Sequence, residues 1–298
     1  MIQILLLHLV YGATFTISKI LLQYSQPIFV IGLRMCLAGV LLTAIASLLK
    51  KNNVTYDKYT IFCLLQIAVF SIFLPYSLRY WSLKYLSVAK TAFIYNLSPF
   101  ISCGFAYLFL KERVTFKKMV GMMIGFVSII PMLITADPTE SSKFLWMGVS
   151  VAEITMLISV TSFCYGWIVM KKLQTHQPLF PFALNGRVMF FGGLLSLGSA
   201  CVAGEACTIA SPSIFFSWLF LIILMTNVFC FTLYARLLRV YSATLISLGS
   251  LIAPLSASIT GWLYFGEALS MNMVYAAGLI IIGFLVFYYD EMVMAKSH

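Results

Sequence analysis

The carboxylate of Glu153 lies inside a long apolar stretch, where a charge is costly to bury and therefore indicates a function. The run from 144 to 170 is largely apolar, so a helix that starts at Phe144 would carry Glu153 roughly 14 Å inwards. We expect this carboxylate to bind a cationic group, such as a substrate amine, or to carry a coupling proton. The alternative is a buried structural ion pair with Lys90 or Arg79.

Two arginines, Arg34 and Arg187, also fall inside apolar stretches, about 9–12 Å from where their helices would begin. We interpret both as structural residues that hydrogen-bond to backbone carbonyls or extend towards the membrane surface. The alternative for Arg187, which lies close to Asn185, is that it holds a substrate carboxylate.

A polar stripe runs along residues 86–110, and its spacings of 4, 4, 3 and 4 place it on one face of a helix. Residues 241–265 carry a similar series. In a membrane helix such stripes face protein or water, so we expect the two helices to line a common path; the alternative is close packing through small residues. The stripes are Ser87, Thr91, Tyr95, Ser98 and Ser102, and Ser247, Ser250, Pro254 and Ser258.

Aromatic and amide side chains within the apolar stretches complete the candidate binding set, because they can stack on a planar substrate or hydrogen-bond to it. With Glu153, we expect the substrate to contact Tyr11, Tyr76, Tyr80, Tyr95, Asn96, Asn185, Asn227, Tyr234 and Ser250.

The composition determines which elements position these residues. The chain has 298 residues, of which 62% are hydrophobic and 9% charged, and its mean hydropathy is +1.00. A soluble domain has about a quarter charged residues, whereas a membrane helix needs about 20 apolar residues in a row. We expect an all-α integral membrane protein with ten transmembrane helices at 3–22, 28–49, 60–82, 86–110, 117–135, 144–170, 179–203, 213–235, 241–265 and 272–290.

The positive charges predict the orientation of these helices. With both termini in the cytoplasm, most lysines and arginines fall in the inner connections, as is typical of membrane proteins. The exception is an outer connection that holds Arg79, Lys84 and Lys90. The net charge of +10 therefore does not indicate nucleic acid. We expect a multi-pass protein of the cell (inner) membrane.

The two halves of the chain repeat each other. A shift of 155 residues places Ser87 on Ser242, Pro99 on Pro254 and Glu112 on Glu267 without a gap. Five helices per half give the copies opposite orientations, which is typical of secondary transporters that bind substrate where the halves meet. We expect one half at 1–136, the second at 144–290 and a short tail at 291–298.

Several residues at corresponding places carry a resemblance to the EamA-type branch of the drug/metabolite transporter superfamily. They are Tyr11-Gly12, Arg34, Pro99 with Leu110–Glu112, and Pro254 with Tyr264–Glu267. The chain resembles this family over nearly its whole length, although Tyr11 replaces a usual tryptophan and Lys111 a usual glycine. The resemblance implies ten helices around a central cavity, cytoplasmic termini, and alternating-access transport of small organic metabolites.

We expect structural or gating roles for six of these residues. Glu112 and Glu267 should accept hydrogen bonds from the N–H groups that begin the next helix. Pro99 and Pro254 should kink their helices, either as a flexible gate or as a fixed bend. Arg34 and Arg187 complete this group. Whether Cys201 and Cys207 form a disulfide stays open.

These features favour a secondary transporter for a zwitterionic or aromatic metabolite, for instance an amino acid or an adenosyl compound such as S-adenosylmethionine. The alternatives are a membrane-embedded enzyme or a passive channel, but the sequence has three histidines, no H-E-x-x-H motif and no charged filter ring. We expect no enzyme activity, no cofactor, no metal and no nucleic-acid partner. The expected partners are the small-molecule substrate, the lipid bilayer and a coupling proton or exchange substrate; we favour a monomer.

Overall fold

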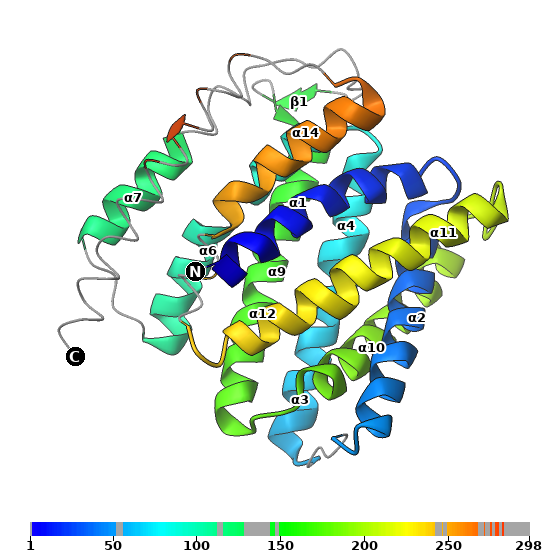
Figure 1. Cartoon of the computed structure of the whole chain (residues 1–298), viewed down its shortest axis with the longest axis vertical. Helices are drawn as coiled ribbons and strands as arrows, with labels where there is room; N and C mark the ends of the chain where they lie inside the picture. The colour runs from blue at the N-terminus through cyan, green and yellow to red at the C-terminus, as the bar shows by residue number, and fades with distance from the viewer. Residues whose placement is uncertain are drawn as a thin grey trace.

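The computed structural model describes residues 2–51, 56–111, 116–127, 144–146, 149–241, 246 and 249–267, together with 271, 275, 278, 279 and 282. In these ranges the chain forms a helical bundle with one short β-hairpin, and α7 lies at the edge of the bundle (Figure 1). The elements of the first part are α1 (Ile2–Leu21), α2 (Pro27–Leu48), α3 (Lys58–Ile67), a π-helical segment (Ala68–Phe73), α4 (Leu74–Leu83), α5 (Val88–Tyr95), α6 (Ser98–Phe105), a second π-helical segment (Ala106–Leu110) and α7 (Phe116–Val127).

The second part begins with the hairpin and continues as helices. Its elements are β1 (Phe144–Trp146), β2 (Val149–Ser150), α9 (Val151–His176), α10 (Pro181–Val202), α11 (Pro212–Ile222), a π-helical segment (Ile223–Cys230), α12 (Phe231–Leu237), a 3-10 turn (Gly249–Ile252) and α14 (Ala253–Phe265).

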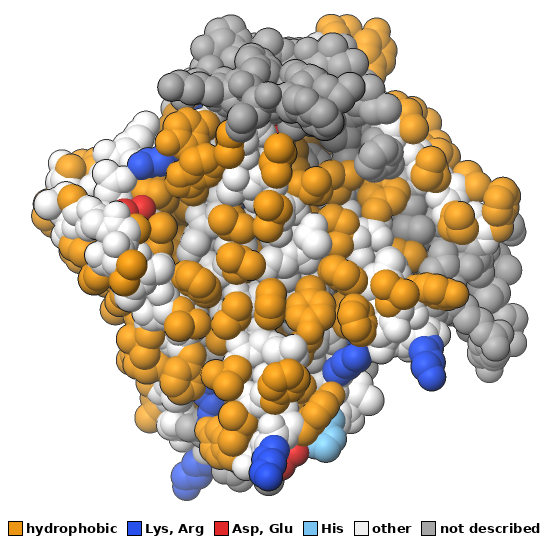
Figure 2. All heavy atoms as spheres, turned by 180° about the vertical axis from the view of Figure 1, so that it is seen from behind, with side chains coloured by type: hydrophobic (Ala, Val, Ile, Leu, Met, Phe, Trp, Pro, Cys, Tyr) orange, Lys and Arg blue, Asp and Glu red, His pale blue; other side chains and the backbone are white. Residues whose placement is uncertain are grey.

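Six helical stretches in the described ranges, counted across π-helical segments and one two-residue turn, are long and apolar enough to cross a bilayer. Apolar side chains cover the middle of one face of the molecule, and lysines and arginines gather towards one end of that face (Figure 2). This distribution suits a protein whose sides contact lipid and whose ends contact water. The six stretches are Ile2–Leu21, Pro27–Leu48, Lys58–Leu83, Val88–Leu110, Val151–His176 and Pro212–Leu237.

The sixth expected helix starts later in the chain than its apolar run. Residues 144–150 pair as β1 and β2, and the helix begins at Val151. Ser150 caps this helix: its Oγ accepts a hydrogen bond from the Glu153 N–H at 3.2 Å, and Glu153 accepts one from the Ser150 N–H at 2.6 Å. This reciprocal pair is a capping box, which satisfies two N–H groups at the helix start and marks where the helix begins.

The two prolines expected to kink helices instead stand at helix starts. Pro99 is the second residue of α6, after a break at Asn96 and Leu97, and Pro254 is the second residue of α14, after the turn Gly249–Ile252. Proline suits the first turn of a helix, because the N–H group it lacks has no partner there. The regular α-helix is therefore interrupted at matching places in both halves, and at Pro99 the interruption lies within the membrane-length stretch Val88–Leu110. A gating role for either proline stays a prediction.

Glycines allow α2 and α10 to pack with their backbones in close contact. A Cβ atom added at Gly39 of α2 would lie 2.6 Å from the backbone nitrogen of Phe190 on α10, and one added at Gly193 would lie 2.6 Å from the nitrogen of Cys36. Membrane helices without a hydrophobic driving force between them associate through such small residues.

Replacing Gly39 by alanine should therefore destabilise the protein, because the neighbouring backbone has to move. We expect Gly39→Ala to cost about 1–3 kcal/mol and to lower the unfolding temperature of the purified protein in detergent. Gly198→Ala on α10 is the matched control, since an added Cβ there meets nothing within 4 Å and alanine favours a helix over glycine. Equal unfolding temperatures for the two variants would contradict this account of the packing.

Candidate functional site

A central cavity lies where elements of both halves meet. It brings together one residue of α1, the break between α5 and α6, the middle of α9, α12 and the turn before α14. Its free space is about 10 Å³, which is roughly the room that one water molecule needs. A metabolite can therefore enter only if the surrounding side chains separate. The lining residues are His8, Tyr95, Ser98, Ser102, Phe163, Cys164, Trp167, Tyr234 and Ser250.

Aromatic rings form much of the cavity wall. Trp167 and Tyr234 lie with their ring centroids 3.8 Å apart and their planes at 30°. Phe163 packs edge-on against Trp167 at 5.6 Å and contacts Tyr95 at 5.8 Å. Such rings stack on planar groups and attract cations through their π faces, so this wall can hold a nucleobase or a positively charged group.

Hydroxyl groups from the two halves meet directly at the helix breaks. The Ser98 Oγ lies 2.9 Å from the Ser250 Oγ, within hydrogen-bonding distance, although the residues are 152 positions apart in the chain. The polar stripes of residues 86–110 and 241–265 thus contribute to one site. Asn96 lies at the same break, fully buried, and neither its Oδ1 nor its Nδ2 has a hydrogen-bond partner in the described part of the chain.

His8 is a cavity residue that the sequence-based candidate set omits. Its Nε2 lies 2.8 Å from the Ile246 carbonyl oxygen, and its ring faces Tyr11 and Tyr234 with centroids 6.2 and 6.4 Å away. The signal was available in the sequence, since a histidine inside an apolar membrane stretch is uncommon. Tyr11 itself is buried beside this cluster.

Arg34 is fully buried and binds side chains of two other helical segments. Its Nε donates to the Asn227 Oδ1 at 2.9 Å and its Nη1 to the Tyr80 hydroxyl at 2.8 Å. We expected backbone carbonyls as partners, whereas the two hydrogen bonds of Arg34 go to a side-chain amide oxygen and a phenol oxygen. These bonds also engage two candidate substrate contacts, Tyr80 and Asn227, with the arginine.

Arg187, the expected counterpart of Arg34, has different surroundings. Its Nη1 donates to the Ala183 carbonyl at 2.6 Å, as expected, and its Nε donates to the Tyr56 hydroxyl at 2.7 Å. Asn185 is fully buried on the same helix. Neither Arg187 nor Asn185 lines the central cavity.

Glu153 lies in the first turn of α9 and forms an ion pair with Lys90, with 2.9 Å between Oε1 and Nζ. The expected depth of roughly 14 Å from a start at Phe144 is therefore wrong, since α9 begins only at Val151. Its other oxygen belongs to the capping box. This geometry favours the structural ion pair over contact with substrate, and α9 is thereby connected to α5.

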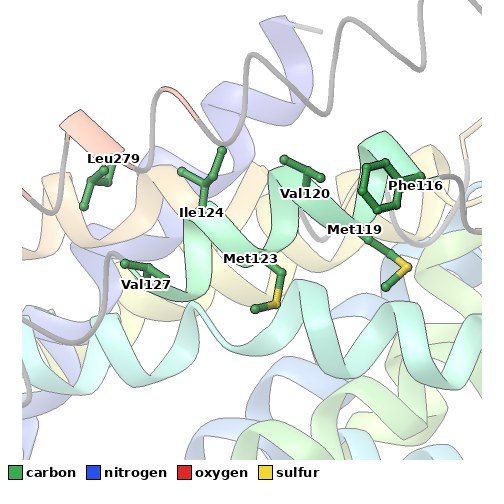
Figure 3. A pocket seen from close by; sticks show the side chains of 7 residues that line it. All are labelled: Phe116, Met119, Val120, Met123, Ile124, Val127 and Leu279. Atoms are coloured by element: carbon green, nitrogen blue, oxygen red, sulfur yellow. The ribbon is translucent and has the colours of Figure 1, made fainter.

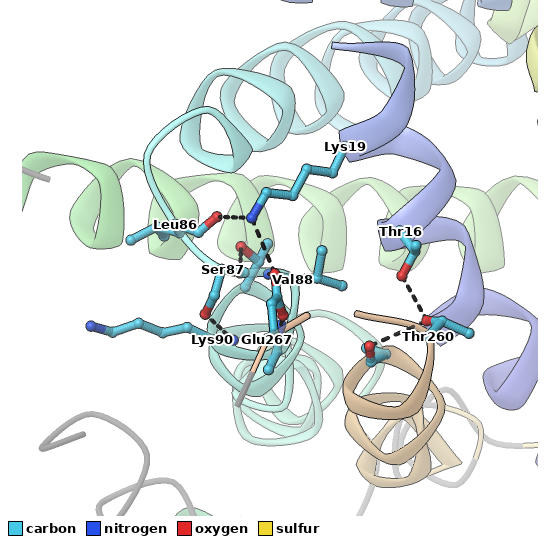
Figure 4. Close-up of polar contacts among 11 residues, drawn as sticks. Thr16, Lys19, Leu86, Ser87, Val88, Lys90, Thr260 and Glu267 are labelled. Atoms are coloured by element: carbon cyan, nitrogen blue, oxygen red, sulfur yellow. Dashed lines mark hydrogen bonds and ion pairs between the residues drawn. The ribbon is translucent and has the colours of Figure 1, made fainter. Parts of the chain in front are cut away.

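Glu267 caps a helix of the opposite half. Its two carboxylate oxygens accept hydrogen bonds from the N–H groups of Val88 at 2.8 Å and Ala89 at 3.2 Å, which begin α5, and Lys19 of α1 donates to it at 3.1 Å (Figure 4). We expected Glu267 to cap the helix that follows it, whose first residues lie outside the described ranges; among the described residues its hydrogen bonds go to the start of α5 and to Lys19. Glu112, its expected counterpart, lies outside the described residues.

Each of the four carboxylates in the described ranges caps a helix. Besides Glu267 and Glu153, Glu205 accepts hydrogen bonds from the Ile28 and Phe29 N–H groups of α2, both at 3.0 Å. Asp57 caps α3, and its hydrogen bonds with Thr60 lower the pKa of this exposed carboxyl group. Helix starts carry partial positive charge and unpaired N–H groups, which a carboxylate satisfies.

A second, larger hollow of about 340 Å³ lies along α7, and its lining is entirely apolar (Figure 3). Because it offers no polar group that could orient a metabolite, it is not a candidate substrate site. Cys201 and Cys207 are exposed free thiols and do not form a disulfide. No group of three or more potential metal ligands occurs among the described side chains.

Comparisons with known proteins agree with this architecture. The profile of the EamA-like transporter family matches residues 1–134 and again 150–289. A Chlamydia muridarum protein named S-adenosylmethionine/S-adenosylhomocysteine transporter is 29% identical over 95% of this chain and 89% of its own length. A Chlamydia trachomatis serovar D protein of the same name is 30% identical over 95% of this chain and 86% of its own length.

More distant similarities extend over most of the chain as well. An Archaeoglobus fulgidus protein named as an uncharacterized transporter is 22% identical over 93% of this chain and 94% of its own length. A protein of known crystal structure superposes with a TM-score of 0.70 at 13% identity, over 95% of this chain and 94% of its own. At this identity the superposition shows a shared fold.

The cap on α5 should matter more for stability than the cap on α2, because Glu267 is 1% exposed whereas Glu205 is partly exposed. We expect Glu267→Ala to destabilise the protein by about 2–4 kcal/mol, since it leaves two buried N–H groups without an acceptor and removes the anion that pairs with Lys19. Glu205→Ala is the control and should cost about 1 kcal/mol. Thermal unfolding in detergent measures both, and a larger effect at Glu205 would contradict the assignment.

Proposed function

Since this chain belongs to the EamA-like transporter family, and is a multi-pass membrane transporter rather than an enzyme, we propose that it carries an adenosyl amino acid such as S-adenosylmethionine or S-adenosylhomocysteine. The observation that carries the proposal is the aromatic cavity at the junction of the two halves. Relatives named for transport of these two compounds match 95% of the chain.

The chemistry of the cavity suits such a substrate. An adenosyl amino acid has a planar base, ribose hydroxyls and a zwitterionic amino-acid part, and in S-adenosylmethionine also a sulfonium cation. The paired rings of Trp167 and Tyr234 suit the base, and π faces attract a sulfonium as they attract other cations. Ser98 and Ser250 offer hydroxyl groups that can exchange their mutual hydrogen bond for one with ribose.

We further propose the complete architecture and mechanism. Ten transmembrane helices form two inverted halves, at 1–136 and 144–290, with both termini in the cytoplasm and a tail at 291–298. The double match of the family profile and the matching breaks at Pro99 and Pro254 support this arrangement. A cavity with almost no free space suits an occluded state, from which the halves expose the site alternately to each side.

Reconstitution tests the substrate directly. Liposomes that contain the purified protein and unlabelled S-adenosylhomocysteine should take up labelled S-adenosylmethionine saturably and faster than unloaded liposomes. Uptake that is linear in concentration and indifferent to internal substrate would contradict a carrier for these compounds. A pH gradient across unloaded liposomes separates proton coupling, for which Glu153 stays the candidate, from exchange of the two metabolites.

The aromatic wall provides a variant for the same assay. Trp167→Ala should lower the apparent affinity for S-adenosylmethionine roughly tenfold or more, because stacking on an aromatic side chain contributes about 1–3 kcal/mol per base. Trp218→Ala is the control, since Trp218 lies on α11 against Tyr264 and outside the cavity. Equal losses in both variants would indicate a general effect of removing tryptophan.

Cysteine labelling tests the orientation. If both termini are cytoplasmic, Cys201 and Cys207 lie on the outer side, and both thiols are exposed. A membrane-impermeant maleimide added to intact cells should label the protein, and the double variant Cys201→Ser/Cys207→Ser should lose that label. Labelling that requires opened cells would place this connection inside and reverse the proposed topology.

A further inference from the structure

Arg79 is a buried cation without a partner of opposite charge. It lies on α4, its exposed fraction is 5%, and in the described part of the chain its guanidinium has neither a carboxylate nor a hydrogen-bond partner. Its contacts are with rings: its Cζ lies 4.1 Å from the Tyr76 centroid and 5.1 Å from that of Phe15. An unpaired charge inside a membrane protein is costly, and it commonly marks the path of a charged substrate.

Arg34 adds a second positive charge at the same ring. Its Cζ lies 5.4 Å from the Tyr76 centroid, and its two hydrogen-bond partners, Asn227 and Tyr80, are neutral. Its remaining nitrogen, Nη2, is buried without a partner among the described residues. Two guanidinium groups therefore lie against Tyr76, each with a buried nitrogen that has no hydrogen-bond partner among the described residues.

The protein has no carboxylate available to these arginines within the described ranges. The four that are described, Asp57, Glu153, Glu205 and Glu267, are each bound to the N–H groups of a helix start. Two of them also have a lysine partner. These four anions are already engaged, so none of the described carboxylates pairs with Arg79.

The arginines lie one layer of rings away from the central cavity. Phe15, which contacts Arg79, packs edge-on against the cavity residue Tyr95 at 5.8 Å. Tyr76, which contacts both arginines, packs against the cavity residue Phe163 at 6.4 Å. When a substrate separates these rings, a group at one of its ends can reach Arg79 while the other end lies against Trp167 and Tyr234.

We propose that Arg79, supported by Arg34, is the subsite that binds the carboxylate of the substrate's amino-acid part. This proposal rests on the proposed transport of adenosyl amino acids. Guanidinium pairs with carboxylate through two parallel N–H···O bonds, which gives both strength and orientation. The substrate would then lie with its base against Trp167 and Tyr234 and with its carboxylate at Arg79, beside Tyr76. The subsite would bind compounds without a carboxylate more weakly.

A comparison of two ligands with two variants tests this subsite. The ligands are S-adenosylhomocysteine and its decarboxylated analogue, and the readout is their affinity for the purified full-length protein by calorimetry. We expect Arg79→Gln to weaken the binding of S-adenosylhomocysteine roughly 10- to 100-fold, as for the loss of a charge-assisted hydrogen bond. The affinity for the decarboxylated analogue should stay unchanged. Arg187→Gln is the control for removing an arginine and should change neither affinity.

Arg79→Lys keeps the charge but loses the planar fork, so it should retain only part of the preference for the carboxylate. This variant also serves if Arg79→Gln does not fold. Equal losses for both ligands in the Arg79 variants would overturn the proposal and make Arg79 a brace for the aromatic rings. A further measurement adds inorganic phosphate as a competitor. If phosphate displaces S-adenosylhomocysteine as effectively as an amino acid with a free carboxylate does, the assignment of the subsite to a carboxylate would be overturned.

The proposed function can fail separately from the subsite. If the wild-type protein binds no adenosyl compound, a thermal-shift screen against amino acids and their decarboxylated amines follows. Stabilisation of the wild type by an amino acid but not by its amine, lost in Arg79→Gln, would support the carboxylate subsite with another substrate. Stabilisation of wild type and variant alike would overturn it.

Discussion

The buried start of α5 depends on a carboxylate that comes from the other half of the protein. In lipid, the first N–H groups of a helix cannot turn to water, so each must find an acceptor inside the protein. Glu267 supplies that acceptor to Val88 and Ala89, and Lys19 balances its charge. The ends of α14, α5 and α1 are thereby held together. These helices, or the segments joined to them, contribute Ser250, Tyr95 and His8 to the central cavity.

The same physical rule accounts for the other carboxylates that the structure describes. Glu205 satisfies the start of α2, and Glu153 with Ser150 satisfies the start of α9. The ion pair from Glu153 to Lys90 connects α9 to α5. Negative charge is thus placed at the ends of helices, and the interior around Tyr76 keeps its positive charge. The carboxylate subsite that we propose at Arg79 depends on this division of charge.

The cavity itself depends on interruption of the helices. Ser98 and Ser250 lie at the breaks before Pro99 and Pro254, and their hydroxyl groups meet in the cavity lining. Irregular backbone at membrane depth is tolerated where it borders a cavity inside the protein. Because the rings of Trp167, Tyr234 and Phe163 line this region and leave only about 10 Å³ of free space, a metabolite can enter only when these side chains move apart.

Much of the fold followed from the sequence because hydrophobic length and charge asymmetry are local properties. The apolar runs predicted the membrane helices, and the repeat with its Pro and Glu positions indicated the family, which the comparisons confirm. The stripe residues Tyr95, Ser98 and Ser250 reach the cavity. The hydrogen-bond partners of the buried charged residues were harder to predict. Glu267 caps α5, Arg34 binds Asn227 and Tyr80, and Glu153 forms the capping box at the start of α9.

Partners are harder to predict because the hydrophobicity of a residue indicates whether it lies in lipid, in water or in the protein interior, but does not indicate which residue it contacts. The sequence by itself determined that this chain crosses a membrane in two related halves and carries a metabolite. Only the tertiary structure decided which buried charges are paired and which are not, because pairing depends on distances between helices that are far apart in the chain. That difference separates Glu153, whose charge is balanced by Lys90, from Arg79, which faces aromatic rings alone in the described protein.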